Sequence, residues 1–571
     1  MTFRILTILA LAAPLHFTPP AANATEAAGA YLAARQARFS NDYDAATEYY
    51  VRALAKDPSN PAILEYTVAA MVSLGRFDSA VPLARRMEEG EFRSQIAQMV
   101  LLADEVARGD YRATLARIQR ERGVGPLADG LIAAWATLGE GDMAQALNLF
   151  DNVAQEAGLK SFAMYHKALA LASVGDFEAA DRIYSGEAGG PMQATRSGIV
   201  AWAEVLSQLE RNDDAIKVLD DVFGNTQDPQ LADLRARLAA GERVPFSRIS
   251  SPRAGIAEVF YSLGRALLQD TGEDYVLLYS RLTEHLDENH IDARLMTAEL
   301  LESMGRYKLA SEAFARVPVD HPSFHAAELG RAEVLRSEGD TDAAVEVLEA
   351  LRVSHPTLPQ VHAAAGDLYR QLEKFDQAVA AYDVAIDLYD AQETPQWFVF
   401  YARAISHERI GSWESAEADF RRALELNPEE PQVMNYLGYS LVEKQIKLDE
   451  ALDLIERAVA AQPDSGYIVD SLGWVLYRLG RYDEAIVHME RAAELMPVDP
   501  VVNDHLGDVL WSVGRFTEAE FQWKRALSFV DKDKPSQDVK PERIRRKLEV
   551  GLTQVLKDEG AVPLKVSKDD G

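Results

Sequence analysis

The chain contains no cysteine among its 571 residues. This absence excludes disulfides, thiolate metal sites, a cysteine nucleophile and the lipidated cysteine of a bacterial lipoprotein. It leaves the compartment open, because a chain without cysteine suits both oxidising and reducing spaces. Long apolar runs are scarce as well: beyond the N-terminus, no stretch approaches the roughly 20 residues that a bilayer-spanning helix needs.

Basic residues are fewer than acidic residues in this chain. The 59 Lys and Arg residues face 90 Asp and Glu residues, which gives a formal net charge of −31. Nucleic acids and anionic membrane surfaces are bound mainly through Lys and Arg, so neither is expected as a partner. The same charge favours solubility and basic partners.

The N-terminus has the pattern of a secretory signal. Arg4 precedes the mostly apolar run Ile5–Ala13, and a small-x-small sequence ends at Ala24. This order of features predicts a signal peptide over residues 1–24, cleaved after Ala24. An uncleaved anchor is the alternative. Together with the acidic, alanine-rich composition, the signal predicts a periplasmic protein without a transmembrane segment.

A period near 34 residues is the most informative pattern in the chain. Segment 472–497 recurs at 506–531, so that Gly473 returns as Gly507 and Ala485 returns as Ala519. Each unit shows an apolar helix pattern, a glycine followed by a polar and an aromatic residue, and a second helix pattern. The glycine suits a helix end because it adopts positive φ without strain. The small residues suit close approach of neighbouring helices, where a larger side chain would overpack.

These units resemble tetratricopeptide repeats, which are helix hairpins of about 34 residues. Unit starts are expected near Ala27, Pro61, Gln95, Leu127, Ser161, Arg196, Ile291, His325, Pro359, Trp397, Pro431, Gly466 and Pro500. The resemblance implies an all-α protein, an α-solenoid in which tandem hairpins wind into a right-handed superhelix and a C-terminal helix caps the last one.

The spacing of the units predicts how the chain is divided. In order, the expected parts are the signal peptide (1–24), an N-terminal array (25–228), an irregular or divergent-repeat connector (229–290), a C-terminal array (291–530), and a capping helix with a tail (531–571). A terminal helix must cover the last apolar face of an array, and Pro541–Leu556 has a suitable pattern. Its basic cluster is expected to face solvent, with a docking site as the alternative; the cluster comprises Arg543, Arg545, Arg546 and Lys547.

Patterns that carry catalysis are weak. The glycine-containing run 123–128 mimics a dinucleotide fingerprint but includes Pro126 and follows no strand pattern. His321 and His325 have helical metal-ligand spacing, yet Pro322 lies between them, which favours a structural or solvent-facing role. We therefore expect no catalytic, cofactor-binding or metal-binding residues, no cofactor, and no enzyme activity.

In the resembled family, the first helix of each unit lines a concave groove that binds protein segments. The candidate binding residues implied by that resemblance are Asn435, Tyr439, Tyr467, Asp470, Trp474, Tyr477, Asp504, Asp508 and Trp511. Aromatic side chains beside hydrogen-bonding groups suit protein recognition. The alternatives are half-buried helix contacts for Trp474 and Tyr477, and solvent-facing carboxylates for Asp504 and Asp508. Groove residues that are neutral or acidic favour a basic or neutral extended segment as the partner.

The resulting hypothesis is a non-catalytic scaffold or adaptor in the bacterial envelope. Three stretches, 435–439, 470–474 and 505–511, are similar to a group of long bacterial repeat proteins, some of which are lipoproteins that activate a periplasmic protease. That similarity implies an adaptor for a protease or an assembly complex, although this chain lacks the lipidated cysteine. A self-associating structural component of an envelope assembly or polysaccharide export complex is the alternative, and the oligomeric state is left open.

Overall fold

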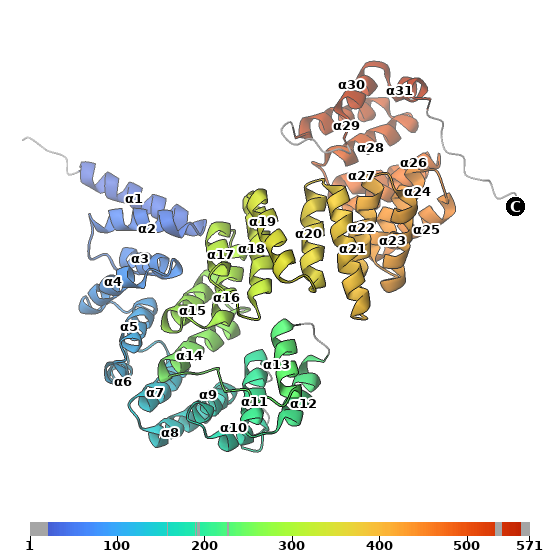
Figure 1. Ribbon diagram of the computed structural model, residues 1–571. Coiled ribbons are helices and arrows are strands. Elements are labelled where there is room, and N and C mark those ends of the chain that lie inside the picture. Colours follow the sequence, from blue (N-terminus) through green and yellow to red (C-terminus); the bar gives the residue numbers. More distant parts are fainter. Residues whose placement is uncertain are drawn as a thin grey trace, which may run out of the picture. The chain divides into compact units, whose positions relative to one another are not determined.

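The computed structural model describes residues 21–156, 158–188, 190, 195–224, 228–531 and 539–560. These residues form an all-α protein built from successive helix hairpins, with no β-strand among them (Figure 1). Residues 1–20, which hold most of the expected signal peptide, and residues 561–571 lie outside the described part. The chain divides into two compact units between Val347 and Leu348.

The first unit contains the helices from α1 to α18 and the start of α19. Their bounds are α1 (Ala21–Phe39), α2 (Tyr43–Leu54), α3 (Pro61–Ser73), α4 (Phe77–Glu89), α5 (Gln95–Ala107), α6 (Tyr111–Gln119), α7 (Pro126–Gly139), α8 (Met143–Ala154), α9 (Lys160–Ser173), α10 (Phe177–Tyr184), α11 (Arg196–Gln208), α12 (Asn212–Phe223), α13 (Pro229–Ala239), α14 (Pro252–Leu267), α15 (Glu273–Leu286), α16 (Ile291–Ser303), α17 (Tyr307–Phe314), α18 (Phe324–Glu338) and α19 (Thr341–Ser354).

The second unit contains the helices from α20 onward. Their bounds are α20 (Pro359–Gln371), α21 (Phe375–Ala391), α22 (Trp397–Arg409), α23 (Trp413–Leu426), α24 (Pro431–Glu443), α25 (Leu448–Ala461), α26 (Gly466–Arg478), α27 (Tyr482–Leu495), α28 (Pro500–Ser512), α29 (Phe516–Phe529), α30 (Pro541–Val550) and α31 (Leu552–Asp558). The predicted unit starts after the first coincide with helix starts to within one residue, which confirms the period.

Local sequence explains where the helices begin and end. Many first helices open with proline after a capping side chain, as where Asp499 accepts hydrogen bonds from the backbone of the turn that Pro500 begins. The glycine between the two helices of a hairpin has positive φ, as at Gly480 (φ 75°) and Gly514 (φ 85°). That conformation is the one predicted for these glycines.

Small residues in the first helix make room for large ones in the second. A Cβ atom on Gly473 of α26 would lie 2.3 Å from the Sδ of Met489 in α27, and one on Gly507 of α28 would lie 2.3 Å from the Nε1 of Trp523 in α29. Ala485 and Ala492 are fully buried in the same interface. The close approach predicted from the sequence is therefore confirmed in the hairpins from α26 to α29.

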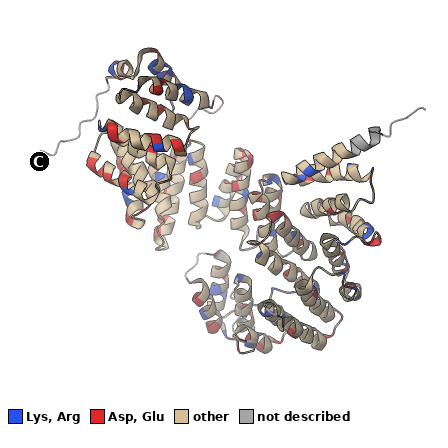
Figure 2. Cartoon of the chain, turned by 180° about the vertical axis from the view of Figure 1, so that it is seen from behind, with Lys and Arg blue, Asp and Glu red and all other residues tan. Residues whose placement is uncertain are grey.

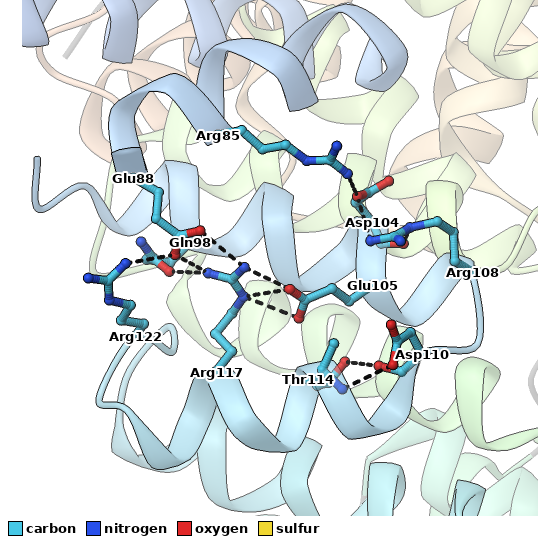
Figure 3. Close-up of polar contacts among 11 residues, drawn as sticks. Arg85, Glu88, Gln98, Asp104, Glu105, Arg108, Asp110, Thr114, Arg117 and Arg122 are labelled. Carbon is cyan, nitrogen blue, oxygen red and sulfur yellow. Dashed lines mark hydrogen bonds and ion pairs between the residues drawn. The ribbon is translucent and has the colours of Figure 1, made fainter. Parts of the chain in front are cut away.

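Polar groups also join neighbouring hairpins of the first unit. Arg117 of α6 is almost fully buried and its guanidinium donates to Glu88 of α4 and to Gln98 and Glu105 of α5 (Figure 3). The Nη1 atom lies 2.6 Å from a Glu88 oxygen, and Nη2 lies 2.7 Å from a Glu105 oxygen. Arg122 also lies 3.3 Å from Glu88, so two guanidiniums balance the charge of the two carboxylates.

The segment expected to be a connector contributes a hairpin to the inside of the first unit. Helices α14 and α15 lie against α3, α5, α7 and α9, the first helices of four successive hairpins (Figure 1). The Nε of Arg281 in α15 donates to the carbonyl of Ser73 in α3 at 3.0 Å, and His285 stacks on Phe77 at 4.1 Å. This hairpin therefore occupies the inner surface that the first array would otherwise present. The predicted part boundaries at 228, 290 and 530 remain predictions.

Candidate functional site

Three successive first helices of the second unit carry most of the predicted binding residues at equivalent positions. Asn435 and Tyr439 lie on α24, Asp470 and Trp474 on α26, and Asp504 and Asp508 on α28, each pair one helical turn apart. Such pairs share a helix face. The contacts of each pair show whether that face is open to a partner or covered by the chain itself.

Trp474 is the centre of an aromatic stack between α26 and α28. Its ring lies 3.9 Å from the ring of His505, nearly parallel, and 4.9 Å from the ring of Tyr477. Its indole N–H donates to Glu443 of α24 at 3.0 Å, and Glu443 also accepts from Arg478. Trp474 therefore links three successive repeats while keeping part of its surface exposed.

Asp470 supports this stack through His505. The Nδ1 of His505 lies 3.0 Å from an Asp470 carboxylate oxygen, and both side chains are largely buried. Burial alone would lower the pKa of His505, but the Asp470 carboxylate, with Asp504 and Asp508 nearby, outweighs burial and raises it. The imidazolium is thereby favoured next to the tryptophan face, an arrangement that cation–π attraction also stabilises.

The third pair is occupied by the chain's own C-terminal helix. Lys547 of α30 is fully buried, with its Nζ 2.8 Å from Asp504 and 2.5 Å from Asp508. Asp508 also accepts from the indole N–H of Trp523 at 2.9 Å. The expectation that the basic cluster faces solvent is therefore wrong for Lys547, because two carboxylates one turn apart bind its ammonium group.

Neither carboxylate of this pair faces solvent freely. Asp508 is 1% exposed, and Asp504 is partly buried beneath Lys547. Trp511 is likewise covered: its indole N–H donates to Thr553 of α31 at 2.9 Å, and its ring lies beside Gly551. Gly551 has φ 81° and ends α30, so the predicted single helix over 541–556 is two short helices, α30 and α31. A partner reaching Asp504, Asp508 or Trp511 would have to displace them.

The remaining candidates differ in exposure. Tyr467 is 66% exposed at the start of α26, whereas Tyr477 is buried beneath Trp474 and against Tyr482. Asn435 and Tyr439 are half-buried on α24, and the buried Oδ1 of Asn435 has no hydrogen-bond partner within the described part of the chain. The accessible part of the predicted site thus consists of Tyr467, the edge of Trp474 and the α24 pair.

Sequence reasoning missed a second site in the first unit. Three adjoining cavities of about 420, 620 and 280 Å³ lie where α9, α11 and α13 face α14, α16 and the residues before α18. Ser197 of α11 lines all three, so they form one groove, called here the inner groove of the first unit. Helices α14 and α15 cover the earlier first helices, and α14 also lines the groove.

A buried polar cluster forms one wall of the inner groove. Glu258 of α14 accepts from the hydroxyl of Tyr165 at 2.8 Å and pairs with the Nε2 of His290 at 2.9 Å. Burial and the Glu258 charge both raise the pKa of Tyr165, so its hydroxyl keeps its proton and donates. No sequence pattern marked these residues, because Tyr165, Glu258 and His290 come from different hairpins.

Arg248 and Asp292 also line the inner groove, within electrostatic reach of the Glu258 cluster. The Nη1 of Arg248 is 3.4 Å from Asp292, and its Nε is 3.9 Å from Glu204, which already accepts two hydrogen bonds from Ser247. Neighbouring Arg196 is held at 2.7 Å by Asp228 and lies 3.9 Å from Asp292. The groove therefore contains charged groups whose pairing is looser than elsewhere in the unit.

Neither surface has the groups of a metal centre. Across the described ranges, no cluster of three or more His, Asp or Glu side chains is placed to bind a metal ion. His321 and His325 line the groove but form no such cluster there. A search of the described helices for a long apolar segment that could cross a bilayer finds none.

Comparisons with known proteins agree with this architecture. Models of the tetratricopeptide repeat match residues 24–93, 295–359, 359–392, 401–466 and 469–497. A TPR repeat-containing protein of Pseudomonas aeruginosa is 32% identical over 83 residues, a match that spans only 14% of this chain and 14% of that relative.

Solved structures with a similar arrangement include two long proteins. The APC/C hetero-tetramer Cut9–Hcn1 matches with 15% identity, a TM-score of 0.38, and coverage of 92% of this chain and 96% of the other. Yeast Tom70 matches with 15% identity, a TM-score of 0.34, and coverage of 93% and 96%. At such TM-scores neither likeness bears on the function of this chain.

The tandem hairpins, with their glycine turns and small-residue interfaces, define an α-solenoid. The repeat matches make the assignment specific. The chain is a tetratricopeptide repeat protein.

Proposed function

We propose that this protein is a non-catalytic scaffold that holds segments of other proteins on the inner surfaces of its repeats. The observation that carries the proposal is that the chain already uses these surfaces for binding. Helices α14 and α15 lie on the inner surface of the first array, and Lys547 of α30 is bound by two inner-surface carboxylates of α28. Surfaces that accept the chain's own helices are suited to accept others.

The accessible binding surface in the second unit is the edge of the Trp474 stack with Tyr467. Rigid aromatic side chains with polar neighbours are the usual anchors of protein interfaces. Glu443 and Asp470 lie beside them, so the surface favours a basic or neutral segment. The proposed role is that this protein acts as an adaptor for a protease or an assembly complex, with this surface as its binding site.

A bacterial periplasmic location is part of the proposal. It is supported by the pattern of residues 1–24. Fractionation of cells producing the full chain, with mass spectrometry of the mature N-terminus, tests it. The expected mature protein begins at Thr25 and is released with the periplasm; an intact Met1 in the cytoplasmic fraction contradicts the proposal.

Site-specific photocrosslinking tests the scaffold itself. A photoreactive phenylalanine analogue would replace Tyr467 of α26 or Asn289, an exposed residue that lines the inner groove, and Val487 of α27 serves as the outer control because it is 64% exposed. We expect crosslinks to other proteins in cell extract from the inner positions and few from Val487. Equal crosslinking from all three positions argues against inner-surface binding. Crosslinks to a second copy of the chain favour the alternative, a self-associating envelope component.

A further inference from the structure

We infer that the inner groove of the first unit binds an extended polypeptide segment that carries basic side chains. The inference rests on the proposed scaffold function and adds the location and the chemical class of one ligand. Three properties of the groove support it. The groove is open, its carboxylates outnumber the guanidiniums that could pair with them, and its walls carry groups that can bond a peptide backbone.

The groove is open because the internal hairpin lines it without filling it. Residues of α14 between Glu258 and Ala266 form one wall, and residues of α11 and α13 form another, with the cavities between them. Together the adjoining cavities exceed the volume of a single small-molecule pocket, yet their volume is far below that of a folded domain. A chain in extended conformation fits such a space.

The pairing of charges leaves a surplus of carboxylates. Among the described residues, the nearest ionic partner of Asp292 is 3.4 Å away, and that of Asp233 is 3.9 Å away. The Asp287 side chain accepts only a backbone N–H, from Asn289, and Glu299 has no direct partner among the described residues.

The arginines of the groove are fewer and mostly engaged. Arg196 is bound closely by Asp228, and Arg237 is bound closely by Glu242. Arg248 is loosely paired, and Arg265 makes no direct ion pair within the described part of the chain. Four loosely paired carboxylates against two such guanidiniums leave a surplus of two negative charges. Lys or Arg side chains of a ligand would satisfy it, and an anionic ligand would not.

The walls also offer partners for a peptide backbone. The amides of Gln230 and Asn289 and the hydroxyl of Ser197 line the groove, and each can bond an N–H or C=O group of an extended chain. The rings of Tyr165 and Tyr261 provide faces for the stems of long basic side chains.

Fluorescence anisotropy with the full chain tests the inference. The probes are two short labelled peptides with blocked ends, one alternating lysine with serine and the other alternating glutamate with serine. We expect saturable binding of the lysine peptide and none of the glutamate peptide. The double variant Asp292→Asn/Glu299→Gln should bind the lysine peptide about tenfold more weakly, the loss expected when two charged contacts of the groove are removed.

A matched control separates the groove from the general negative charge of the protein. Asp464→Asn/Glu429→Gln removes the same number of charges from carboxylates of the second unit that are 82% and 76% exposed. This control should bind like the wild type. A second test keeps the charge unchanged: Ser197→Trp, which fills the point shared by the three cavities, should abolish binding while the thermal melting curve stays within a few degrees of wild type.

Each contrary outcome has a distinct meaning. Equal weakening in the groove and control variants, or preference for the glutamate peptide, overturns the inference. Binding that survives Ser197→Trp but is lost on Tyr467→Ala overturns it too, while leaving the scaffold function supported in the second unit. Absence of peptide binding together with absence of any photocrosslink from Tyr467 or Asn289 refutes both proposals.

Discussion

Gly255 of α14 lies directly against the indole ring of Trp135 in α7, although the two residues are far apart in the chain. A Cβ atom on Gly255 would stand 2.3 Å from the Cδ2 of Trp135, closer than any non-bonded contact allows. Trp135 is fully buried and held by a hydrogen bond from its N–H to the Nδ1 of His166. It therefore cannot move aside, and the glycine fixes how deeply the internal hairpin sits.

Gly255→Val should destabilise the first unit by about 1–3 kcal/mol, because the added side chain overpacks against a fixed ring. Chemical denaturation followed by tryptophan fluorescence measures the loss. Gly29→Val is the control, since a Cβ at that exposed position of α1 meets nothing within 4 Å. A Gly255→Val variant as stable as the control would mean that the hairpin does not pack at Trp135.

Lys547 determines whether the C-terminal helices stay on the last repeat. Lys547→Met removes the ammonium that lies between Asp504 and Asp508. The Asp508 carboxylate, which is 1% exposed, then loses a close positive partner. We expect a loss of about 3–5 kcal/mol, the usual result of removing one partner of a buried pair. Hydrogen exchange should then increase in α30 and α31.

The exposed residue Arg545 provides the comparison for Lys547. Its ion pair with Glu542 lies at the surface, so Arg545→Met should change stability by less than about 1 kcal/mol. Similar exchange rates in α30 for the two variants would contradict the central role assigned to Lys547.

The Arg117 cluster should make the first unit sensitive to acid. Burial by itself would raise the pKa of Glu88, but its bonds to Arg117 outweigh burial and lower it below the ordinary value of 4.5. A lowered folded-state pKa means that the stabilisation is complete above that ordinary value and is lost as pH falls through the folded value. The melting temperature of the wild type should therefore drop steeply below about pH 4.5.

The triple variant Arg117→Met/Glu88→Gln/Glu105→Gln tests the cause of this acid sensitivity. It removes Glu88 together with the residues bonded to it in the cluster, so its melting temperature should fall less steeply with acid (Figure 3). An unchanged slope would assign the acid sensitivity to other carboxylates.

His505 should show the opposite dependence on pH. Its pKa is raised above the ordinary 6.5, so the stabilisation from its pair with Asp470 is complete below that value and is lost as pH rises through the folded value. Proton NMR of the imidazole resonances measures the shift directly. Asp470→Asn should return the pKa towards or below 6.5, because burial then dominates. A pKa unaffected by this substitution would show that Asp470 is not the cause.

The repeats could be predicted accurately from the sequence because the residues that identify a repeat all lie within that repeat. The turn glycine, the proline that opens a helix and the small residues facing Met489 or Trp523 each lie within one unit of about 34 residues. The predicted importance of Gly473 has the same basis: Gly473→Leu should destabilise the second unit, and an unchanged melting curve would contradict its place in the packing.

The binding surfaces could be predicted only in part, because they depend on distant segments. Inner-surface positions such as Asp470 and Trp474 followed from repeat spacing, but their partner His505 belongs to the next unit. That α30 covers Asp508, and that α14 fills the first array, could not be read from any period. Charge was no guide either, since acidic and basic positions occur along the helices of both units (Figure 2).

The internal hairpin also changes how the first unit must fold. In a simple repeat array each unit touches only its neighbours, and folding can spread from any point. Here the bond from Arg281 to the carbonyl of Ser73 joins residues separated by more than 200 positions. During synthesis the inner surface of α3 to α7 stays uncovered until α15 has left the ribosome, so the unit completes its core late. Once closed, these repeats should unfold together as one cooperative block.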